Sequence, residues 1–400
     1  MSSSISGTAG DSLSRKLIVL AVTGSIAAVR TVDLVRDLIR RGARVHCVMS
    51  GAAQEIIHPH ALEYASENPV VTRITGRVEH VEFCGVGGRA DLLLIAPATA
   101  NSIGKIACGI DDTPVTTYAT TALGSGVPVM VVPAMHEAMY RHPAVAKNLD
   151  SLRSMGVRVV DPRIEEEKAK IAENSTVVME VERLLSPGDL AGRKILITSG
   201  ATAERVDPIR ILTNRASGRT GTEIALEARR RGAEVTLVHR GRLGLPLREV
   251  YVESAADMLA AVLAELDGGG YDGMIAAAAV SDYTLDPSAE KIKSGSELVL
   301  RLAPTTKIIK NVRSLHPHLK MVGFKAETFL SDDELISRAR ESMEKNRLDL
   351  VVANDVGKGG MGTEENRVLI IGRSGVKSEV SGKKRAIAKA VIDALAEEFA

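Results

Sequence analysis

Two similar stretches, residues 16–48 and 193–235, constrain the fold of this chain more than any other feature. Each opens with a continuous apolar run, at 16–22 and 193–199, which is typical of a strand buried on both faces. A turn then leads into a segment with helical spacing, and the sequence Arg-Arg-Gly-Ala-x-Val follows at 40–45 and again at 230–235. Strand, helix and strand in this order predict the start of a parallel sheet. We therefore expect an α/β fold with two such domains.

The chain length agrees with two domains, because 400 residues exceed what one hydrophobic core usually serves. The first 14 residues are rich in Ser and Gly and predict a flexible tail. Ser186-Pro187-Gly188 is the best candidate for a linker. We therefore place the first domain at 15–189 and the second at 190–400.

Composition excludes several classes of function. A net charge of +1 gives no electrostatic basis for binding nucleic acid or a membrane, and the absence of Trp removes stacking platforms. No apolar run approaches membrane-spanning length. Cys47, Cys84 and Cys108 are isolated, which argues against a disulfide framework and a zinc site and fits the cytoplasm.

Four loops of the first half follow predicted strands, at 23–26, 49–51, 97–101 and 133–136. Ligands of parallel sheets bind beyond the carboxyl ends of the strands. The loops are rich in Ser, Thr, Ala and Gly, which suits a phosphate and a polyol. Ordinary βα turns are the alternative for each loop taken singly. The glycine pattern is not GxGxxG, which disfavours NAD.

Two histidines of the first half are candidate catalytic residues. His80 stands between Glu79 and Glu82, in a stretch (55–88) that we expect to be irregular; by itself it is typical of a surface histidine. His136 follows a strand, where sites usually lie, and imidazole is well suited to moving protons near neutral pH.

Four motifs of this half together resemble the FMN-dependent phosphopantothenoylcysteine decarboxylases. They are Thr-Gly-Ser-Ile-Ala-Ala at 23–28, Glu-His-Val-Glu at 79–82, Ala-Pro-Ala-Thr-Ala-Asn at 96–101 and Pro-Ala-Met-His-Glu-Ala-Met-Tyr at 133–140. The resemblance implies a flavodoxin-like (Rossmann-like) fold that trimerises and binds FMN between subunits, with the active-site histidine at His80. In that family FMN oxidises the substrate thiol to a thioaldehyde, carbon dioxide leaves and the enethiolate is then reduced. The FMN-binding residues it implies are Gly24, Ser25, Ile26, Ser50, Pro97, Ala98, Thr99, Asn101 and Met135.

The chain departs from this family at two places. His136 replaces an Asn thought to bind the substrate carboxylate, a role that a charged histidine can also fill. The family's bacterial members carry a reductive cysteine in a flap, whereas residues 161–187 contain no cysteine, as in the archaeal branch. Lys168 and Lys170 of this charged stretch are either substrate ligands or part of a solvated surface.

The second half carries a different anion-binding pattern. Ser217 and Gly218 offer hydroxyl and backbone donors where a helix begins, which suits a triphosphate. The segment is not GxxxxGK[ST], so it is not a P-loop. Asp282 follows a strand, and Lys291 and Lys293 are either phosphate ligands or two exposed lysines of a polar loop.

Five motifs of the second half together resemble phosphopantothenate–cysteine ligase. They are Asp-Pro-x-Arg at 207–210 with Asn-x-x-Ser-Gly at 214–218, Ala-Ala-Val-Ser-Asp-Tyr at 278–283, Glu-Lys-Ile-Lys at 290–293, Gly-Phe-Lys-Ala-Glu-Thr at 323–328 and Ala-Asn-Asp at 353–355. The family activates the phosphopantothenate carboxylate with CTP as an acyl-cytidylate, and the amine of cysteine then displaces CMP. A Mg²⁺ ion on the triphosphate is expected, with no protein ligand assigned.

This second resemblance also implies roles for individual residues. Asn214 and Arg210 hold the acyl-cytidylate, and Lys291 neutralises phosphate charge. The nucleotide and substrate site as a whole comprises Arg210, Asn214, Ser217, Gly218, Ala278, Asp282, Lys291, Lys293, Phe324 and Lys345.

Both resemblances, in this order, are those of the bifunctional proteins of coenzyme A biosynthesis. The ligase makes 4′-phosphopantothenoyl-cysteine and the decarboxylase converts it to 4′-phosphopantetheine. Trimeric and dimeric contacts together imply a homo-oligomer, a dodecamer in the family. The alternatives are an active ligase joined to a flavoprotein with a prenyl-transfer or regulatory role, and a pair of NAD-binding domains.

Overall fold

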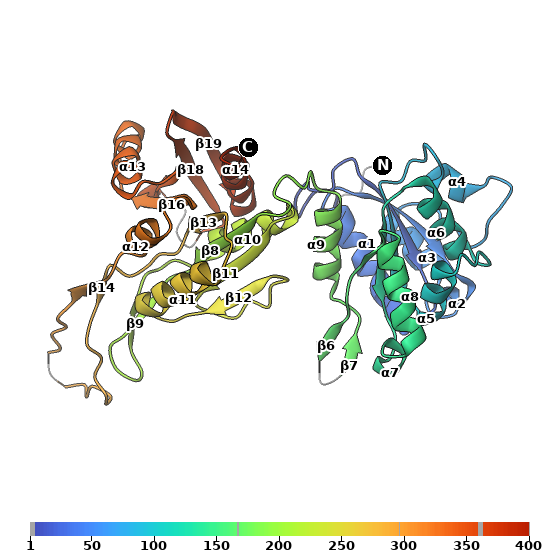
Figure 1. Ribbon diagram of the computed structural model, residues 1–400, viewed down its shortest axis with the longest axis horizontal. Helices are drawn as coiled ribbons and strands as arrows, with labels where there is room; N and C mark the ends of the chain where they lie inside the picture. The colour runs from blue at the N-terminus through green and yellow to red at the C-terminus, as the bar shows by residue number, and fades with distance from the viewer. Residues whose placement is uncertain (1–4, 166–167, 296, 359–362, 400) are drawn as a thin grey trace. The chain divides into compact units, whose positions relative to one another are not determined.

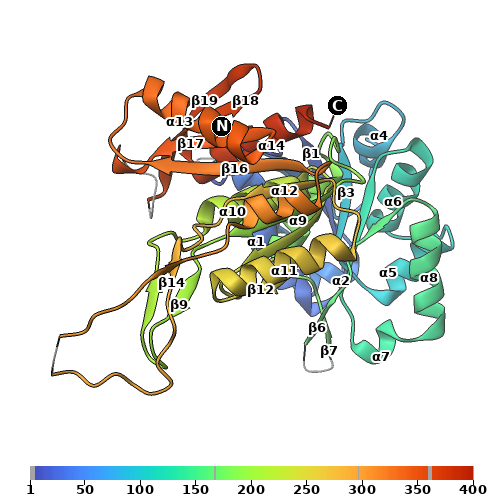
Figure 2. The same cartoon turned by 60° about the vertical axis from the view of Figure 1, so that its left-hand side comes forward.

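The computed structural model describes residues 5–165, 168–295, 297–358 and 363–399, with the side chains of 163–170 left out. The chain divides into two compact units, Met1–Ser186 and Pro187–Ala400. Both are mixed α/β structures built on a central sheet (Figures 1 and 2). No helix in the described ranges has the length and apolar character needed to cross a membrane.

The first unit is built on a five-stranded parallel sheet with the order β2-β1-β3-β4-β5. This order is that of flavodoxin-like folds, with a switch point between β1 and β3. The strands are nearly continuous apolar runs because helices cover both faces. Their bounds are β1 Leu17–Val22, β2 Arg44–Met49, β3 Leu92–Ala98, β4 Val129–Pro133 and β5 Arg158–Val159.

Two hydrophobic clusters lie on the two faces of this sheet. One is packed by α1 (Thr31–Arg40), α3 (Pro59–Ser66) and α9 (Asn174–Leu184). The other is packed by α4 (Glu79–Cys84), α5 (Ala100–Ala107), α6 (Pro114–Ser125) and α8 (Pro143–Ser154). The expectation that 55–88 is irregular is therefore wrong for α3 and α4. Pro59 does not break structure but occupies the first turn of α3, where its missing N–H costs nothing.

The expectation of a flexible amino-terminal tail is wrong for residues 5–14. The last carbonyls of α1 have no partner within the helix, and this segment supplies donors to them. Gly7 N–H binds Ile39 O at 3.2 Å, and Leu13 N–H binds Arg41 O at 2.9 Å. The Leu13 side chain is fully buried in the core cluster of α1 and α9. The polar composition of this segment gave no indication of these hydrogen bonds or of the buried leucine.

Short elements surround the carboxyl ends of the strands in this unit. They are η1 (Ile26–Arg30) after β1, α2 (Gly51–Gln54) after β2 and α7 (Glu137–Tyr140) after β4. The charged stretch expected to be a flap contains an antiparallel hairpin of β6 (Arg163–Glu165) and β7 (Lys168–Lys170). Strand β7 lies against α7 (Figure 1).

The second unit has an eight-stranded sheet with the order β12-β11-β8-β13-β16-β17-β18-β19. The first six strands are parallel and follow the order 3-2-1-4-5-6 of doubly wound dinucleotide-binding folds. The last two form an antiparallel hairpin. The bounds are β8 Lys194–Ser199, β11 Glu234–His239, β12 Arg248–Tyr251, β13 Gly273–Ala276, β16 Lys320–Glu327, β17 Leu350–Asp355, β18 Glu365–Gly372 and β19 Gly375–Lys383.

Helices cover both faces of this second sheet as well. On one face lie α10 (Arg219–Arg230) and α14 (Lys384–Glu397). On the other lie α11 (Ala255–Gly268), α12 (Ile308–Leu315) and α13 (Asp332–Asn346). Two small ladders stand apart: β9 (Ala203–Arg205) with β10 (Ile211–Thr213), and β14 (Tyr283–Thr284) with β15 (Ala303–Pro304). The chain between β14 and β15 projects from the unit in both views (Figures 1 and 2).

Candidate active sites

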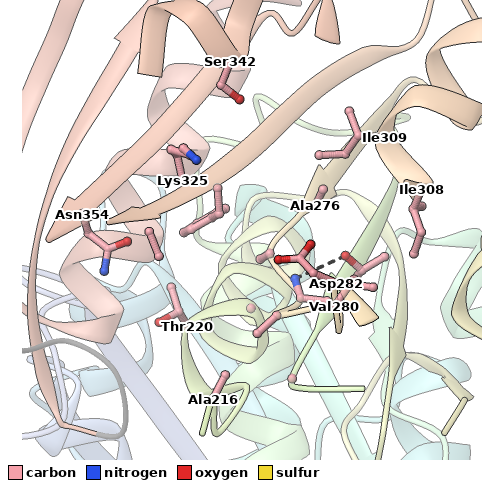
Figure 3. Close-up of a pocket in the computed structure, with 18 of the residues that line it drawn as sticks. Ala216, Thr220, Ala276, Val280, Asp282, Ile308, Ile309, Lys325, Ser342 and Asn354 are labelled. Carbon is pink, nitrogen blue, oxygen red and sulfur yellow. Dashed lines mark hydrogen bonds between the residues drawn. The ribbon is translucent and has the colours of Figure 1, made fainter. Parts of the chain in front are cut away.

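A cavity of about 710 Å³ opens at the carboxyl ends of the central strands of the second unit. The chain leaves β8 and β13 in opposite directions there, so the topology itself produces a crevice. Six residues predicted from the sequence line this cavity: Ser217, Gly218, Ala278, Asp282, Phe324 and Lys345. Figure 3 shows Asp282 among the lining residues.

The first turn of α10 approaches strand β8 closely in this cavity. The Ser199 hydroxyl donates to Gly218 O at 2.8 Å, and Gly218 caps the helix in the left-handed region, with φ of 77°. A Cβ on Gly221 would stand 2.4 Å from Ser199 Oγ, so only glycine permits this approach. The first N–H groups of α10 therefore open onto the cavity, as phosphate-binding turns require.

The cavity is strongly basic, which the sequence analysis did not recognise. Its acidic lining residues are Asp282 and Glu341. Its basic lining residues come from five elements and their flanks: Arg219, Lys307, Lys310, Lys325, Arg338, Lys345 and Lys384. Lys325 lies within the Gly-Phe-Lys-Ala-Glu-Thr motif, so a signal for it was present. Lys345 was implied by the resemblance, and the remaining basic residues are too far apart in sequence for spacing to indicate a common site.

Three of these cations already face carboxylates. Lys325 Nζ lies 3.0 Å from Glu327 Oε1, and Arg338 Nη1 lies 4.0 Å from the same oxygen. Lys307 Nζ is paired with Asp282. The carboxylates hold these basic groups at the edge of the cavity.

Lys384 is the most buried cation of the cavity, with 7% of its surface exposed. Burial lowers the pKa of its ammonium group, and the neighbouring Arg219 lowers it further. Lys384 is also the first residue of α14, where the helix dipole disfavours positive charge. An anionic ligand would relieve all three effects.

Four predicted residues are not part of this lining. Asn214 lies beside it, because its Nδ2 donates to Ala279 O at 3.0 Å and Ala279 lines the cavity. Arg210 binds Asp207 and Ile292 instead. Lys291 and Lys293 are exposed on the projecting segment between β14 and β15. Within one chain, the structure does not bring these two lysines into the cavity.

Residues predicted to bind FMN gather where β1, β2 and β3 of the first unit end. Thr23 joins two of these loops, since its hydroxyl donates to Pro97 O at 2.7 Å and accepts from Thr99 N at 3.0 Å. Ser25, Ser50 and Thr99 cap η1, α2 and α5. In the rest of the predicted set, Gly24 lies in the loop after β1, Pro97 and Ala98 are the last two residues of β3, and Ile26 and Asn101 lie in the first turns of η1 and α5.

The loop after β4 contributes His136 and Met135 to the same end of the sheet. Met135 is half-buried against the core, whereas His136 is exposed and stands at the N-cap of α7. His136 borders a hollow shared with Glu137, Ala138 and Arg141. The β6–β7 hairpin runs beside α7, so the flap expected over the site lies next to His136. The side chains of Lys168 and Lys170 lie outside the described residues.

His80 lies elsewhere in the first unit. Figures 1 and 2 show its helix, α4, at the opposite end of this unit from α7. Its ring meets Tyr118 edge-on, with centroids 6.4 Å apart, and its Nδ1 is buried with no hydrogen-bond partner among the described residues. Burial raises the pKa of the Tyr118 hydroxyl. His80 and the loops that follow the strands therefore do not form one site within a single chain.

Comparison with known proteins agrees with both halves. The family model described as "Flavoprotein" matches residues 6–186, and that described as "DNA/pantothenate metabolism flavoprotein C-terminal domain" matches 190–399. The coenzyme A biosynthesis bifunctional protein CoaBC of Thermococcus kodakarensis is 51% identical over 94% of this chain and 94% of its own.

The chain belongs to the CoaBC family. The CoaBC protein of Methanocaldococcus jannaschii is 35% identical over 97% of this chain and 95% of its own. That of Escherichia coli K12 is 34% identical over 97% of this chain and 98% of its own. Members of the CoaBC family are bifunctional enzymes, so the chain is a bifunctional enzyme of coenzyme A biosynthesis and its first unit is a flavoprotein unit.

Proposed function

We propose that the second unit, residues 190–400, ligates cysteine to 4′-phosphopantothenate with CTP. A carboxylate oxygen of phosphopantothenate attacks the α-phosphorus, pyrophosphate leaves and an acyl-cytidylate forms. The amine of cysteine then attacks the acyl carbon, and CMP departs with the electron pair of the broken bond. The observation that supports this function is the basic cavity at the switch point, because it suits a nucleoside triphosphate in size, charge and backbone donors.

Roles within the cavity follow from where each residue lies. Ser217, Gly218 and the first turn of α10 receive phosphate oxygens, and Lys325, Arg338 and Lys384 balance their charge. Asp282, Ala278 and Phe324 contact the nucleoside, and Asn214 at the edge of the cavity holds the acyl-cytidylate. Mg²⁺ arrives on the triphosphate, since no cluster of metal-ligating side chains occurs in the ranges that the structure describes.

Lys291 acts on the phosphates from the projecting segment, which we propose engages a second copy of the chain. Leu298, Val299 and Leu302 of this segment are exposed, at 48%, 76% and 45%. Apolar side chains in such a position indicate a partner surface. Dimeric ligase units and trimeric decarboxylase units would build the homo-oligomer that the resemblance implies.

For the first unit, residues 15–189, we propose FMN-dependent decarboxylation of 4′-phosphopantothenoyl-cysteine to 4′-phosphopantetheine. Three features of the loops suit FMN. Gly24 lets the loop after β1 pack closely against α2, because a Cβ at this position would meet Ala52 Cβ at 2.5 Å. Ser25, Ser50 and Thr99 offer hydroxyls, and the side chain of Ile26, which is 77% exposed, is available to cover the flat ring of the flavin. Bound FMN supplies the oxidation of the substrate thiol and the later reduction.

His80 and His136 then act on opposite sides of one substrate. His136, at the N-cap of α7, binds the substrate carboxylate in its charged form. His80 takes the thiol proton in a site completed by another subunit, which explains why it lies apart from the loops of its own chain. The desolvated, unpaired Nδ1 fits a group that finds its partner only in the assembly.

The test is to incubate the full chain, purified with its flavin, with 4′-phosphopantothenate, cysteine, CTP and Mg²⁺, and to identify the products by mass. We expect phosphopantetheine, carbon dioxide, CMP and pyrophosphate. His80→Asn should stop carbon dioxide release and leave ligation intact, and Asn214→Ala should stop amide formation while the flavin spectrum stays. Accumulation of phosphopantothenoyl-cysteine in the unsubstituted enzyme would refute decarboxylation and favour a flavoprotein unit with another role.

We infer a cytoplasmic location from the state of the cysteines rather than from a targeting sequence. The three cysteines are free, and Cys47 and Cys84 are buried. Burial raises the pKa of each of these two thiols to about 12, so both stay protonated and unreactive. Such cysteines suit a reducing compartment.

A further inference from the structure

The segment that carries Lys291 and Lys293 needs support from outside itself. We call residues 285–302 the arm; its described residues form no helix or strand. The β14–β15 ladder closes its base. Hydrogen bonds tie its described residues to the rest of the unit at Ser288, whose N–H binds Val206 O at 3.0 Å, and at Ile292.

Ile292 is held by both of its backbone groups. Its N–H donates to Asp207 Oδ2 at 3.1 Å, and its carbonyl accepts from Arg210 Nη1 at 3.0 Å. The same Arg210 nitrogen is bonded to Asp207 Oδ2, which closes a ring of interactions. We call Asp207, Arg210 and Ile292 the clasp. The clasp holds the arm at Ile292, the residue between Lys291 and Lys293.

Asp207 is well placed to hold the arm through its carboxylate. It is 2% exposed, and its other oxygen accepts the N–H groups of Ile209 and Arg210, each at 2.8 Å. Burial raises its pKa, but the three N–H donors and the Arg210 guanidinium outweigh burial and lower the pKa to about 2. The carboxylate is therefore charged throughout the neutral range, and charged acceptors make the stronger hydrogen bonds.

We propose that Asp207 is a positioning residue of the ligase, which fixes the backbone at Ile292 so that Lys291 reaches the phosphates. The proposal rests on the proposed function of Lys291. Asp207 does not line the nucleotide cavity, and the segment of chain it holds does not line it either. Its effect on catalysis is therefore expected to pass through the arm.

A double-substitution cycle tests this path. In the full-length enzyme, Asp207→Asn should lower the kcat of CTP-dependent pyrophosphate release by about 10- to 100-fold, as small misplacements of catalytic groups do. The KM for CTP should change by less than about twofold, because the clasp lies outside the cavity. In a Lys291→Ala background the same substitution should have almost no further effect, since the group it positions is already gone.

The possible results separate this proposal from the function it rests on. An equal loss of kcat in both backgrounds would refute positioning and leave the role of Lys291 standing. A Lys291→Ala enzyme that ligates normally would refute both. The matched control is Asp286→Asn, the same substitution at an exposed arm carboxylate, which should leave kcat unchanged.

Two further variants keep the test decisive if Asp207→Asn does not fold. Ile292→Pro removes the N–H that Asp207 accepts and also fixes the backbone at Ile292, while it leaves Asp207 and Arg210 in place. It should lower kcat when Lys291 is present and have almost no effect in the Lys291→Ala background. A nitroxide label at Lys293→Cys, in a Cys108→Ser chain, reports the arm directly. Its spectrum should sharpen when Ile292→Pro is added, and an unchanged spectrum would contradict the clasp.

Discussion

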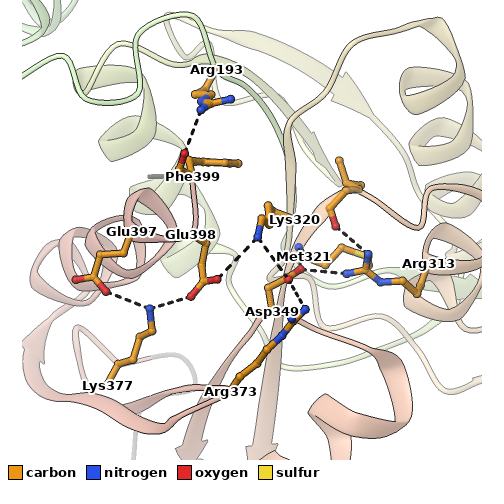
Figure 4. Close-up of polar contacts among 11 residues, drawn as sticks. Arg193, Arg313, Lys320, Met321, Asp349, Arg373, Lys377, Glu397, Glu398 and Phe399 are labelled. Atoms are coloured by element: carbon orange, nitrogen blue, oxygen red, sulfur yellow. Dashed lines mark hydrogen bonds and ion pairs between the residues drawn. The ribbon is translucent and has the colours of Figure 1, made fainter.

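Lys384 is the first residue of helix α14, and Lys377 of strand β19 contacts the opposite end of the same helix. Their environments shift their pKa values in opposite directions. Lys377 Nζ lies 2.8 Å from Glu398 and 3.1 Å from Glu397 at the end of the helix (Figure 4). The hydrogen bond to Glu398 raises the pKa of Lys377, against the effect of burial. At the first residue of α14, burial and Arg219 lower the pKa of Lys384.

The two ends of the strands in the second sheet also differ in how their charged side chains are arranged. At the amino ends of its strands, Asp349 is 5% exposed and is surrounded by Arg313 Nη2 at 3.2 Å, Arg373 Nη2 at 3.0 Å and Lys320 Nζ at 3.9 Å (Figure 4). At the carboxyl ends, basic side chains line an open cavity instead (Figure 3). At one end the charges surround a buried carboxylate. At the other, basic residues outnumber acidic ones around the cavity, and in the proposed function this excess of positive charge binds the triphosphate.

This comparison predicts its largest effect at Asp349. Asp349→Ala should lower the unfolding free energy of the second unit by about 3–5 kcal/mol, because it leaves the guanidinium of Arg313, whose side chain is only 10% exposed, without its carboxylate partner. Asp349 Oδ2 also accepts Met321 N–H at 2.8 Å, so a backbone donor is orphaned too. Urea denaturation measures the loss, and the KM for CTP of the folded fraction should stay constant.

The control for this prediction is Arg373→Gln at the same carboxylate. The Arg373 side chain is 76% exposed, so its removal should cost less than about 1 kcal/mol. A loss at Arg373 as large as that at Asp349 would mean that exposure does not govern the energetics of this cluster.

The second prediction concerns Lys325 at the opposite end of the sheet. Lys325→Met keeps most of the unbranched side chain and removes its charge, so it should raise the KM for CTP about tenfold, equivalent to about 1.4 kcal/mol. The KM should also become less dependent on salt, since one phosphate contact is lost. Unfolding by urea should change little, and a large loss of stability with unchanged KM would reverse the comparison.

The sequence predicted the sheets well because their strands are buried on both faces. Apolar runs such as 17–22, 92–96 and 194–198 have no other stable place in a two-domain chain of this length. Elements without such runs were missed, among them α3, whose first-turn proline looked like a break.

The ligand-binding residues were only partly predictable, for a physical reason. Ser217 and Gly218 sit in one continuous turn, so their chemistry is visible in the sequence. Lys307, Lys325 and Lys384 meet in the cavity only because β16, α12 and α14 are brought together by the sheet. His80 and Lys291 show the limit of the same reasoning: motif resemblance indicated their chemistry but could not show that neither lies in a site of its own chain.

The third prediction uses the direction of the Lys384 pKa. An anionic ligand favours the charged ammonium, so affinity for CTP should fall as pH rises through the lowered pKa, below the ordinary value of 10.5. The free protein should respond in the opposite sense. Between the lowered pKa and the ordinary one the unfolded chain binds more protons, so the unfolding free energy rises with pH.

Titration calorimetry with CTP at a series of pH values, from about pH 8 up to the ordinary pKa of 10.5, measures the first effect, and the affinity should fall as pH rises. The phosphates of CTP are fully ionised across this range and contribute no slope. Lys384→Met should flatten the profile. A profile as steep in the variant as in the original chain would assign the slope to another cavity residue.

The smallest effect is expected at Lys377 of strand β19, which contacts the opposite end of helix α14 from Lys384. Lys377→Gln removes two ion pairs, but Glu397 is 68% exposed and Glu398 is 21% exposed, so water compensates for part of the loss. The unfolding free energy should fall by about 0.5–1 kcal/mol, and the affinity for CTP should stay the same at every pH. Because the raised pKa of Lys377 lies above the neutral range, its stabilising effect persists at neutral pH and is lost only as pH rises through that value. If Lys377→Gln instead altered CTP binding, the two ends of α14 would be coupled, and the separation of structural from ligand-directed charge along this sheet would be wrong.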